Sequence, residues 1–339
     1  MTILVTGSAG FIGANFVLDW LAACDELVIS VDTLAYAGNP ANLHSLENDP
    51  RHCFVQGADK TLIGSLLAGF QPRAILNFAA ESHVDRLVDG PEEFVQTNVV
   101  GTFRLLEAAL AYYRSLDQER AAAFRFPHIS TDEVYGSLAS DEPAFSGRNQ
   151  YQPNSPYSAP KAASDQFVRA CHHTYGFPVL TTNCSNDYGP YHFPEKLIPL
   201  VIHNALAGRA LPIYGDGRQV RDWLDVKDHC AALRCVLATR ELGETYNIGG
   251  CNERTNLQVV SELCEILDSE QPRADGASYR EQITFIDRPT KIQRELGWSP
   301  VETFETGIRK TVRWYLDNQD WVAAITSGAY REWASGHYQ

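Results

Sequence analysis

Three glycines between the first predicted strand and the first predicted helix constrain the fold of this 339-residue chain most strongly. Gly7, Gly10 and Gly13 follow a β-rich run at residues 3–5 and open a helical pattern at residues 11–22. In such a loop the first glycine permits a tight turn, the second lets the backbone approach a pyrophosphate, and the third lets the helix pack on the strand. The N–H groups of the helix start favour a bound anion. The spacing therefore predicts a dinucleotide-binding β–α unit.

Short β-rich runs alternate with helical stretches along the N-terminal part of the chain. This alternation predicts a doubly wound parallel sheet, which is a Rossmann-type α/β fold. The expected strands are residues 3–5, 27–31, 53–55, 74–78, 126–129, 179–182 and 245–248. The expected helices are residues 11–22, 61–67, 94–113, 155–175, 256–268 and 303–318. We expect residues 1–185, with returning segments near 220–248, to form the cofactor domain, and residues 186–339 to form mainly a smaller, interleaved C-terminal lobe for the substrate.

Composition excludes several classes of function. The net charge of −14 argues against nucleic-acid binding, and it requires that an anionic ligand be held by local cations and backbone N–H groups. Eight cysteines without a C-x-x-C pair predict neither a disulfide framework nor a metal site. No apolar stretch approaches the roughly 18 residues of a membrane span, and no leader pattern follows Met1. We therefore expect a cytoplasmic protein without a membrane partner.

A carboxylate at the end of the second predicted strand specifies the cofactor. Asp32 lies 19 residues after Gly13, where its two oxygens can accept hydrogen bonds from the ribose hydroxyls of a dinucleotide. The same charge repels a 2′-phosphate, so the sequence predicts NAD in preference to NADP.

Two groups of side chains indicate the chemistry. Tyr157 and Lys161 lie one helical turn apart, so we expect the ammonium, with the nicotinamide charge, to lower the pKa of the phenol. Such a phenol removes a hydroxyl proton as hydride leaves the adjacent carbon. Thr131, Asp132 and Glu133 follow a predicted strand, at the edge of the sheet that lines the ligand crevice. Two neighbouring carboxyl groups can divide into an acid and a base, which suggests removal of water, although both could instead cap the next turn.

These motifs closely resemble those of the dTDP-glucose 4,6-dehydratases, a family of extended short-chain dehydrogenase/reductases, over nearly the whole chain. The stretches that carry the resemblance are residues 79–86 (AAESHVDR), 130–136 (STDEVYG), 184–199 (CSNDYGPYHFPEKLIP), 211–224 (LPIYGDGRQVRDWL) and 246–250 (YNIGG). The resemblance implies conversion of dTDP-glucose to dTDP-4-keto-6-deoxyglucose and water with recycled NAD. It assigns the 4-hydroxyl proton to Tyr157, the C5 proton to Glu133, protonation of the C6 hydroxyl to Asp132, and contact with the 4-hydroxyl region to Thr131. It also implies a homodimer formed by the helices at 94–113 and 155–175.

The resemblance also implies binding residues, position by position. For the cofactor they are Gly7, Gly10, Phe11, Ile12, Gly13, Asp32, Thr33, Leu34, Ala35, Asp59, Ala79, Ala80, Ser82, Thr97, Tyr157, Lys161 and Asp187. For the nucleotide sugar they are Ser82, Arg86, Thr131, Asn186, Glu195, Lys196, Leu197, Pro212, Ile213, Tyr214, Arg221, Asn256 and Arg288. Arg221 is the natural partner of the diphosphate, because a guanidinium fork matches phosphate oxygens.

Four features depart from the family pattern. The chain is about ten residues short between Pro289 and Thr290, and it is also short at residues 56–60. Pro160 stands within the turn from Tyr157 to Lys161, where it removes one helical N–H; if Ser155 caps the helix, that N–H belongs to the first turn. Asp187 replaces an asparagine, and its charge either favours the oxidised nicotinamide or faces water.

Two alternatives remain open from the sequence. A nucleotide-sugar 4-epimerase shares the fold, NAD and the Tyr/Lys pair, but it has no need of Asp132 and Glu133. A catalytically weakened NAD-binding protein would explain Pro160 and the short segments.

Overall fold

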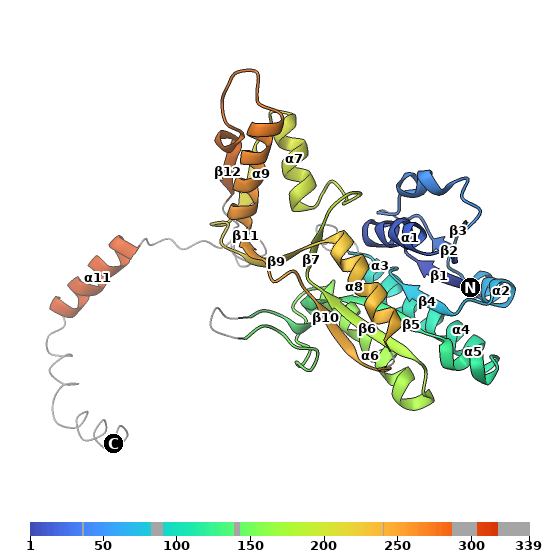
Figure 1. Cartoon of the computed structure of the whole chain (residues 1–339). Helices are drawn as coiled ribbons and strands as arrows, with labels where there is room; N and C mark the ends of the chain where they lie inside the picture. The colour runs from blue at the N-terminus through green and yellow to red at the C-terminus, as the bar shows by residue number, and fades with distance from the viewer. Residues whose placement is uncertain (36, 83–90, 139–142, 240, 287–303, 318–339) are drawn as a thin grey trace, which may run out of the picture. The chain divides into compact units, whose positions relative to one another are not determined.

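A seven-stranded parallel sheet forms the centre of the fold (Figure 1). This computed structural model describes residues 1–35, 37–82, 91–138, 143–239, 241–286 and 304–317. The strand order is β10-β6-β5-β4-β1-β2-β3, which confirms the Rossmann-type fold because β1 lies between β2 and β4. The strands are β1 (Thr2–Thr6), β2 (Leu27–Asp32), β3 (His52–Gln56), β4 (Ala74–Asn77), β5 (Phe126–Thr131), β6 (Val179–Cys184) and β10 (Thr245–Ile248).

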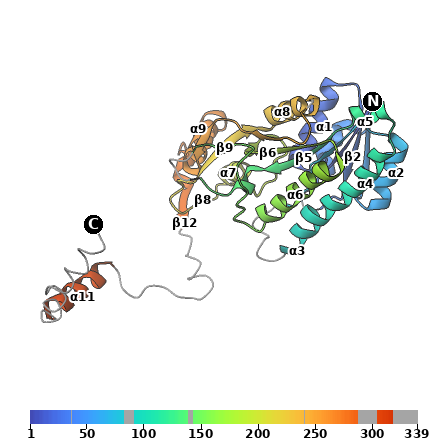
Figure 2. The same ribbon diagram turned by 90° about the horizontal axis from the view of Figure 1, so that it is seen from below.

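Helices cover both faces of this sheet, as Figure 2 shows from below. One face packs against α1 (Phe11–Ala23) and α8 (Val226–Ala238), and the other against α2 (Lys60–Phe70), α4 (Thr102–Arg114) and α6 (Ser158–Tyr175). Because both faces of the sheet are covered, successive side chains of β1 enter the two cores in turn. Ile3 and Val5 belong to one core, and Leu4 belongs to the other. The carboxyl ends of the central strands therefore all point to one edge.

A smaller set of elements follows β6 and forms its own core from residues such as Leu211 and Val260. Its strands form a three-stranded sheet, β11-β9-β7, and a two-stranded sheet, β12-β8. The elements are β7 (Asn186–Tyr188), α7 (Leu197–Leu206), β8 (Leu211–Tyr214), β9 (Val220–Asp225), β11 (Glu253–Thr255), α9 (Asn256–Glu270), η5 (Tyr279–Gln282) and β12 (Ile283–Ile286). Of these, the sequence predicted only α9, because the strands are too short for a clear period of two.

The predicted helix at residues 94–113 is divided into three parts. It consists of α3 (Pro91–Phe94), a π-helical segment η3 (Val95–Gly101) and α4. Within η3 the buried side chain of Asn98 makes two hydrogen bonds with the backbone of Glu81. Its Nδ2 donates to Glu81 O, and its Oδ1 accepts from Glu81 N. A side chain tied to another segment accounts for the wider turn, which periodicity does not reveal.

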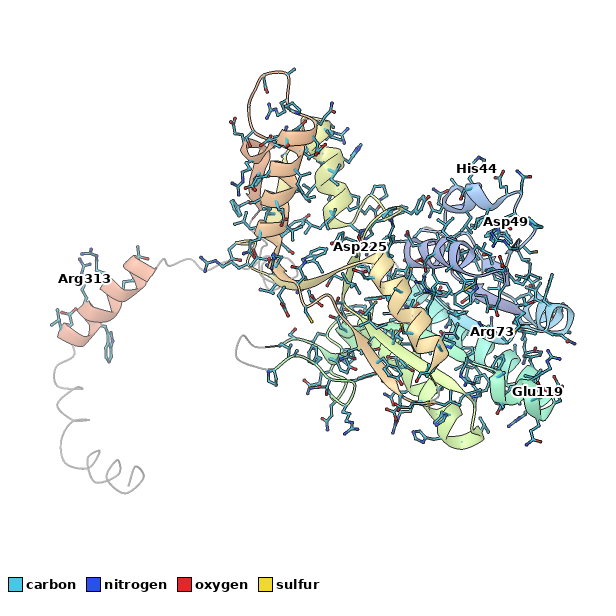
Figure 3. The ribbon with its side chains drawn as sticks, viewed as in Figure 1. His44, Asp49, Arg73, Glu119, Asp225 and Arg313 are labelled. Carbon is cyan, nitrogen blue, oxygen red and sulfur yellow. The ribbon has the colours of Figure 1, made fainter. Side chains whose placement is uncertain are left out.

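Other elements were missed because they are short or depend on a local cap. They are η1 (Pro40–Leu46), α5 (Gln118–Ala123), η4 (Asp132–Tyr135) and α8. Helix α8 begins after Asp225, whose carboxylate accepts a 2.8 Å hydrogen bond from the backbone of Lys227 (Figure 3). Residues 286–339 form a separate compact unit, of which α11 (Phe304–Asp317) is described, close to the predicted 303–318. Among the described helices, none has the length and apolar character that crossing a bilayer requires.

Candidate active site

The loop between β1 and α1 has space only for glycine at two positions. Gly7 has φ of +66°, and a Cβ there would lie 2.6 Å from the backbone nitrogen of Ala79. A Cβ on Gly13 would lie 2.2 Å from the oxygen of Gly7. Helix α1 starts after Gly10, and no side chain of the described residues caps it. Its first-turn N–H groups, beginning with Phe11 and Ile12, are therefore suited to a pyrophosphate.

Asp32 is fixed beside this loop. Its Oδ2 accepts a 2.9 Å hydrogen bond from Ala9 N, and its Oδ1 accepts a 2.8 Å bond from Leu34 N. A Cβ on Gly38 would lie 2.9 Å from Oδ1, so that position also requires glycine. Each carboxylate oxygen keeps a second lone pair. The two oxygens are thus oriented to receive the hydroxyls of a ribose, and the residues present fit a bound NAD.

The other predicted cofactor residues lie along the same edge of the sheet or in η3. Thr33, Leu34 and Ala35 follow β2, Ala79, Ala80 and Ser82 follow β4, and Thr97 lies in η3. Asp59 instead caps α2, because its Oδ1 accepts 3.0 Å hydrogen bonds from the backbone of Thr61 and Leu62. Its contact with the cofactor stays a prediction. The short segment before it is a continuous connection, in which Gly57 N donates to Asp32 O at 2.8 Å.

The carboxyl end of β5 brings the catalytic candidates together. Thr131 ends the strand and caps η4, since its Oγ1 accepts a 3.3 Å hydrogen bond from Glu133 N. The same hydroxyl donates a 3.5 Å hydrogen bond to Oδ1 of Asp132, and the Thr131 side chain also lowers the pKa of the Tyr157 phenol. Both carboxyl groups therefore lie near the phenol, and they are not merely caps of the turn.

The two carboxyl groups have different surroundings. Burial, followed by the charge of Glu133, raises the pKa of Asp132 to about 6. Burial also raises the pKa of Glu133, even though its side chain is open to solvent on one side, while Arg221 and Lys196 oppose that rise. Lys196 influences Glu133 and has no comparable influence on Asp132. Asp132 is the better acid near neutral pH, and Glu133 is the better base.

Tyr157 and Lys161 lie at the start of α6. Lys161 is buried, and its Nζ donates a 2.7 Å hydrogen bond to the backbone oxygen of Ile129. Burial and the charges of Glu133 and Asp132 raise the pKa of Tyr157 well above 10.0, although Thr131 opposes that rise. The predicted lowering of this pKa by Lys161 together with the nicotinamide charge stays a prediction. A cationic ligand group beside the phenol would act in the opposite direction from the carboxylates.

Pro160 does not disturb this helix. The hydroxyl of Ser155 accepts a 2.9 Å hydrogen bond from Ser158 N, and Ser158 Oγ accepts a 3.0 Å bond from Ser155 N. Pro160 is the third residue of α6, so its missing N–H belongs to the first turn, as predicted.

Two of the predicted substrate residues, Arg221 and Lys196, act on the carboxylate pair. Arg221 lies in β9, and its guanidinium lowers the pKa of both Asp132 and Glu133. Asn186 lies in β7, which pairs with β9, and Lys196 Nζ donates a 3.0 Å hydrogen bond to Ser82 O. The others are Glu195 and Leu197 at the start of α7, Pro212, Ile213 and Tyr214 in β8, and Asn256 at the start of α9. Arg86 and Arg288 lie outside the described residues, as does the Pro289–Thr290 junction.

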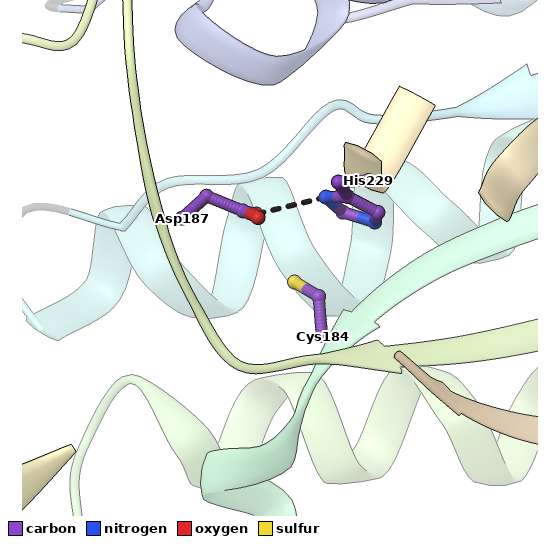
Figure 4. Close-up of side chains that lie close together, drawn as sticks. All are labelled: Cys184, Asp187 and His229. Atoms are coloured by element: carbon purple, nitrogen blue, oxygen red, sulfur yellow. Dashed lines mark hydrogen bonds and ion pairs between the residues drawn. The ribbon is translucent and has the colours of Figure 1, made fainter. Parts of the chain in front are cut away.

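Asp187 does not face water. It is 8% exposed, and its Oδ2 accepts a 2.8 Å hydrogen bond from Nδ1 of His229 (Figure 4). Cys184 completes the group, in which one potential ligand atom from each residue lies within 4.8 Å of the others. The alternative that placed this carboxylate in solvent is wrong, because α8 brings an imidazole to it. No spacing in the sequence indicated His229 or Cys184.

Sequence reasoning also missed a group of buried polar residues behind Lys161. They are Thr6, Asn77, His128, Ser130 and Asp165. One signal was available, because Asp165 follows Lys161 by four residues and so projects from the same helix face.

Comparison with known proteins agrees with this geometry. The GDP-mannose 4,6 dehydratase family profile matches residues 4–311. The chain is 57% identical to a dTDP-glucose 4,6-dehydratase of Xanthomonas campestris over 97% of each chain, and 51% identical to one of Escherichia coli K12 over 100% of this chain and 99% of the other.

Solved structures agree as well. A dTDP-glucose 4,6-dehydratase of Bacillus anthracis in complex with NAD has a TM-score of 0.74 at 41% identity, covering 95% of this chain and 98% of the other. One from Streptomyces venezuelae, with NAD and a dTDP ligand bound, has a TM-score of 0.75 at 43% identity over the same shares. The chain therefore belongs to the dTDP-glucose 4,6-dehydratases, within the extended short-chain dehydrogenase/reductases.

Proposed function

We propose that the side chains at the end of β5 and the start of α6 remove water from dTDP-glucose and give dTDP-4-keto-6-deoxyglucose. The observation that carries this is the meeting of Tyr157, Asp132 and Glu133 around the hydroxyl of Thr131. A phenol alone suffices for oxidation and reduction at one carbon. A neighbouring acid and base are needed when a C–H and a C–O bond must both break.

The cofactor is NAD, for which Asp32 and the loop of Gly7, Gly10 and Gly13 provide the binding groups. When bound, NAD takes a hydride from C4 of the sugar and returns one to C6. Tyr157 and Lys161, at the start of α6, complete the proposed active site.

The residues of the chain move the protons. Tyr157 takes the proton of the 4-hydroxyl as a phenolate, the form that the Thr131 side chain favours, and becomes a neutral phenol. The 4-keto group then makes the C5 proton acidic, and Glu133 takes it. Asp132, whose pKa is about 6, gives its proton to the C6 hydroxyl, which leaves as water. As hydride reaches C6, Glu133 returns a proton to C5. The proton balance closes when Tyr157 releases its proton to solvent and Asp132 is reprotonated.

Local cations offset the negative charge of the chain at the substrate site. Arg221 is the proposed partner of the diphosphate, because a guanidinium binds phosphate oxygens in a fork. Lys196 is held at its position by the bond to Ser82 O. The remaining substrate residues named from the resemblance are proposed to contact the nucleotide sugar from β7, β8, α7 and α9. We accordingly propose residues 1–185, with segments near 220–248, as the NAD domain, and the cytoplasmic location stays a prediction.

We also infer a homodimer through the outer face of α4 and α6. Phe103 and Phe167 are 43% and 41% exposed, and their rings stack edge to face at 5.6 Å. Val95 adds a further 45% exposed side chain on η3. Large apolar side chains that meet on the surface of two adjacent helices favour burial against a second copy of the same face.

The test of the function is product analysis. The protein with NAD is incubated with dTDP-glucose or UDP-glucose, and the product is identified by mass spectrometry and by the alkali-induced absorbance of a 4-keto sugar. We expect a product lighter by one water from dTDP-glucose. Recovery of a C4-inverted hexose of unchanged mass would contradict the proposal and support the epimerase alternative.

A further inference from the structure

We propose that Asp165 is the counter-charge that keeps Lys161 protonated, and that Asp165 is therefore a positioning residue for the Tyr157–Lys161 pair. The inference rests on the proposed function only for the roles of Tyr157 and Lys161. The pairing of charges is a property of the protein itself and can be measured without substrate.

Lys161 is a cation buried in the protein. It is 3% exposed, and the hydrogen bond from its Nζ goes to a neutral acceptor, the backbone oxygen of Ile129. An ammonium in such surroundings loses its hydration, and it keeps its proton only if a negative charge lies near. Burial does lower the pKa of Lys161 below its ordinary 10.5, and Asp165 is the group that most opposes this.

Asp165 lies one helical turn beyond Lys161 and is equally buried. It is 3% exposed, and its Oδ2 accepts a 2.9 Å hydrogen bond from Ser130 Oγ. Its Oδ1 lies 3.2 Å from Nε2 of His128. Both partners come from β5, the strand that also supplies Ile129, so consecutive residues of one strand hold the lysine and the aspartate of α6.

The charge state of His128 follows from its other neighbours. Thr6 Oγ1 donates a 2.7 Å hydrogen bond to Asn77 Oδ1, which fixes the orientation of that amide. The amide nitrogen of Asn77 then lies 3.1 Å from His128 Nδ1. An amide nitrogen can only donate, so Nδ1 must accept and the ring proton is on Nε2, whose hydrogen-bond partner is Ser164 Oγ at 3.3 Å. Burial and the charge of Lys161 also lower the pKa of His128, so the ring is neutral.

The carboxylate of Asp165 thus has one neutral donor, Ser130, on Oδ2, while its buried Oδ1 has no hydrogen-bond partner among the described residues. The titratable groups around the Lys161–Asp165 pair are His128 from β5, Tyr135 from η4, Tyr151 from the segment before α6, and Cys184 from β6. Burial raises the pKa of both tyrosines and of the thiol, so they are neutral as well. Lys161 lies one helical turn from this carboxylate, whose negative charge opposes the fall of the lysine pKa that burial causes.

The consequence for the reaction follows from the position of α6. Tyr157 precedes Lys161 by one turn, and in the protein alone burial and then the charge of Glu133 raise its pKa. Loss of the proton from Lys161 would remove the positive charge of this helix turn and make a phenolate harder to form. Asp165, which lies behind the lysine, therefore acts on the phenol through Lys161.

The first test is stability as a function of pH, with Asp165→Asn compared with Ser130→Ala. The amide keeps the shape but leaves Lys161 unpaired, so the pKa of this lysine in the folded protein falls further below the unfolded value of 10.5. Between those two values the unfolded chain binds more protons, so folding becomes more favourable as pH rises. The urea midpoint of Asp165→Asn should therefore lie furthest below wild type at neutral pH and approach it towards alkaline pH. Ser130→Ala removes a hydrogen bond without changing charge, so its deficit should be the same throughout.

The second test is a double-variant cycle with Lys161→Met. Each single substitution leaves one buried charge unpaired, whereas the double variant leaves none. We expect the urea midpoint of Lys161→Met/Asp165→Asn to lie above that of both single variants. A pH-independent deficit in Asp165→Asn, or additive losses in the cycle, would overturn the proposal. The cycle also covers the case in which a single variant is too unstable to assay for turnover.

The third test is kinetic and separates the two proposals. In Asp165→Asn we expect kcat at neutral pH to fall at least about tenfold, which corresponds to a shift of one pKa unit. KM should change little. The alkaline limb of the profile of kcat against pH should move to lower pH. A wild-type pH profile in this variant would count against the inference and leave the dehydratase function intact. If the stability tests succeed while wild-type protein does not dehydrate dTDP-glucose, the pairing stands and the proposed function fails.

Discussion

The side-chain oxygen of Thr131 accepts a 3.3 Å hydrogen bond from the backbone N–H of Glu133, and the same side chain lowers the pKa of the Tyr157 phenol. One side chain at the end of β5 thus sets the position of the proposed C5 base relative to the proposed C4 base.

Replacing Thr131 by valine should lower kcat about tenfold, because a hydrogen bond that favours the phenolate is lost. The pKa of Tyr157 should rise further, which moves the ascending limb of the kcat profile to higher pH. Thr131→Ser keeps the hydroxyl and should retain most of the activity. Steady-state kinetics over a range of pH decides, and a valine variant with wild-type kcat and profile would remove this role.

Asp132→Asn should be more stable than wild type at neutral pH. The pKa of Asp132 is raised from 3.8 to about 6, so the folded protein binds more protons than the unfolded chain between those values. The stability of the wild type therefore falls as pH rises through this window, whereas the asparagine has no such dependence. We expect an advantage of about 1–3 kcal/mol for the variant above pH 6 and little below pH 4. Urea unfolding at several pH values measures it, and an advantage that does not vary with pH would contradict the assignment.

The same substitution should reduce turnover about a hundredfold or more, because the proposed acid is lost. In wild type the protonated fraction of Asp132 falls as pH rises through about 6, so the dehydration step should slow in that direction. Single-turnover product analysis of Asp132→Asn should show C4 oxidation without loss of water. Dehydration at the wild-type rate would exclude Asp132 as the acid.

Gly13→Ala should abolish cofactor binding and destabilise the protein, since the new Cβ would lie 2.2 Å from Gly7 O. Gly64→Ala is the matched control: Gly64 lies in α2, and a Cβ there has nothing within 4 Å. We expect the control to bind NAD normally and to gain up to about 1 kcal/mol from helix propensity. Calorimetric titration with NAD and thermal unfolding test the pair, and equal NAD affinities would contradict the proposed glycine loop.

Asp32→Asn should weaken NAD binding about 10- to 100-fold and reduce the preference over NADP. The amide can still receive one backbone N–H, but it no longer offers two acceptors to the ribose or repels a 2′-phosphate. Titration with both dinucleotides measures the ratio. An unchanged ratio would show that another residue determines the choice.

The sequence predicted the parts of the fold that depend on local patterns. Strand β1, the glycine loop and α1 appear where expected, because alternation and glycine spacing are visible in a short window. Pro160 was placed correctly in the first turn of α6 from the caps around it. The π-helical turn in η3 was missed, because it depends on the contact of Asn98 with Glu81, a residue from a different segment.

In the candidate site, too, the sequence predicted the residues that a local pattern marks and missed those that only the fold brings together. Tyr157, Lys161, Asp132 and Glu133 were found because their spacing in the chain carries the chemistry. His229 was not, because α8 brings it to Asp187 across 42 residues, and nothing local indicates the pairing. The lowering of the pKa of Tyr157 by Lys161 and the nicotinamide charge stays a prediction, because burial and the charge of Glu133 raise this pKa in the protein alone.

The most direct test of the central claim is the reaction of dTDP-glucose in deuterated water, with wild type compared with Glu133→Gln. The proposed steps predict a 4-keto-6-deoxy product from wild type that has lost one water and carries solvent deuterium at C5. They predict that Glu133→Gln forms no such product and exchanges no deuterium at C5. A deuterated, dehydrated product formed by Glu133→Gln at the wild-type rate would contradict the account.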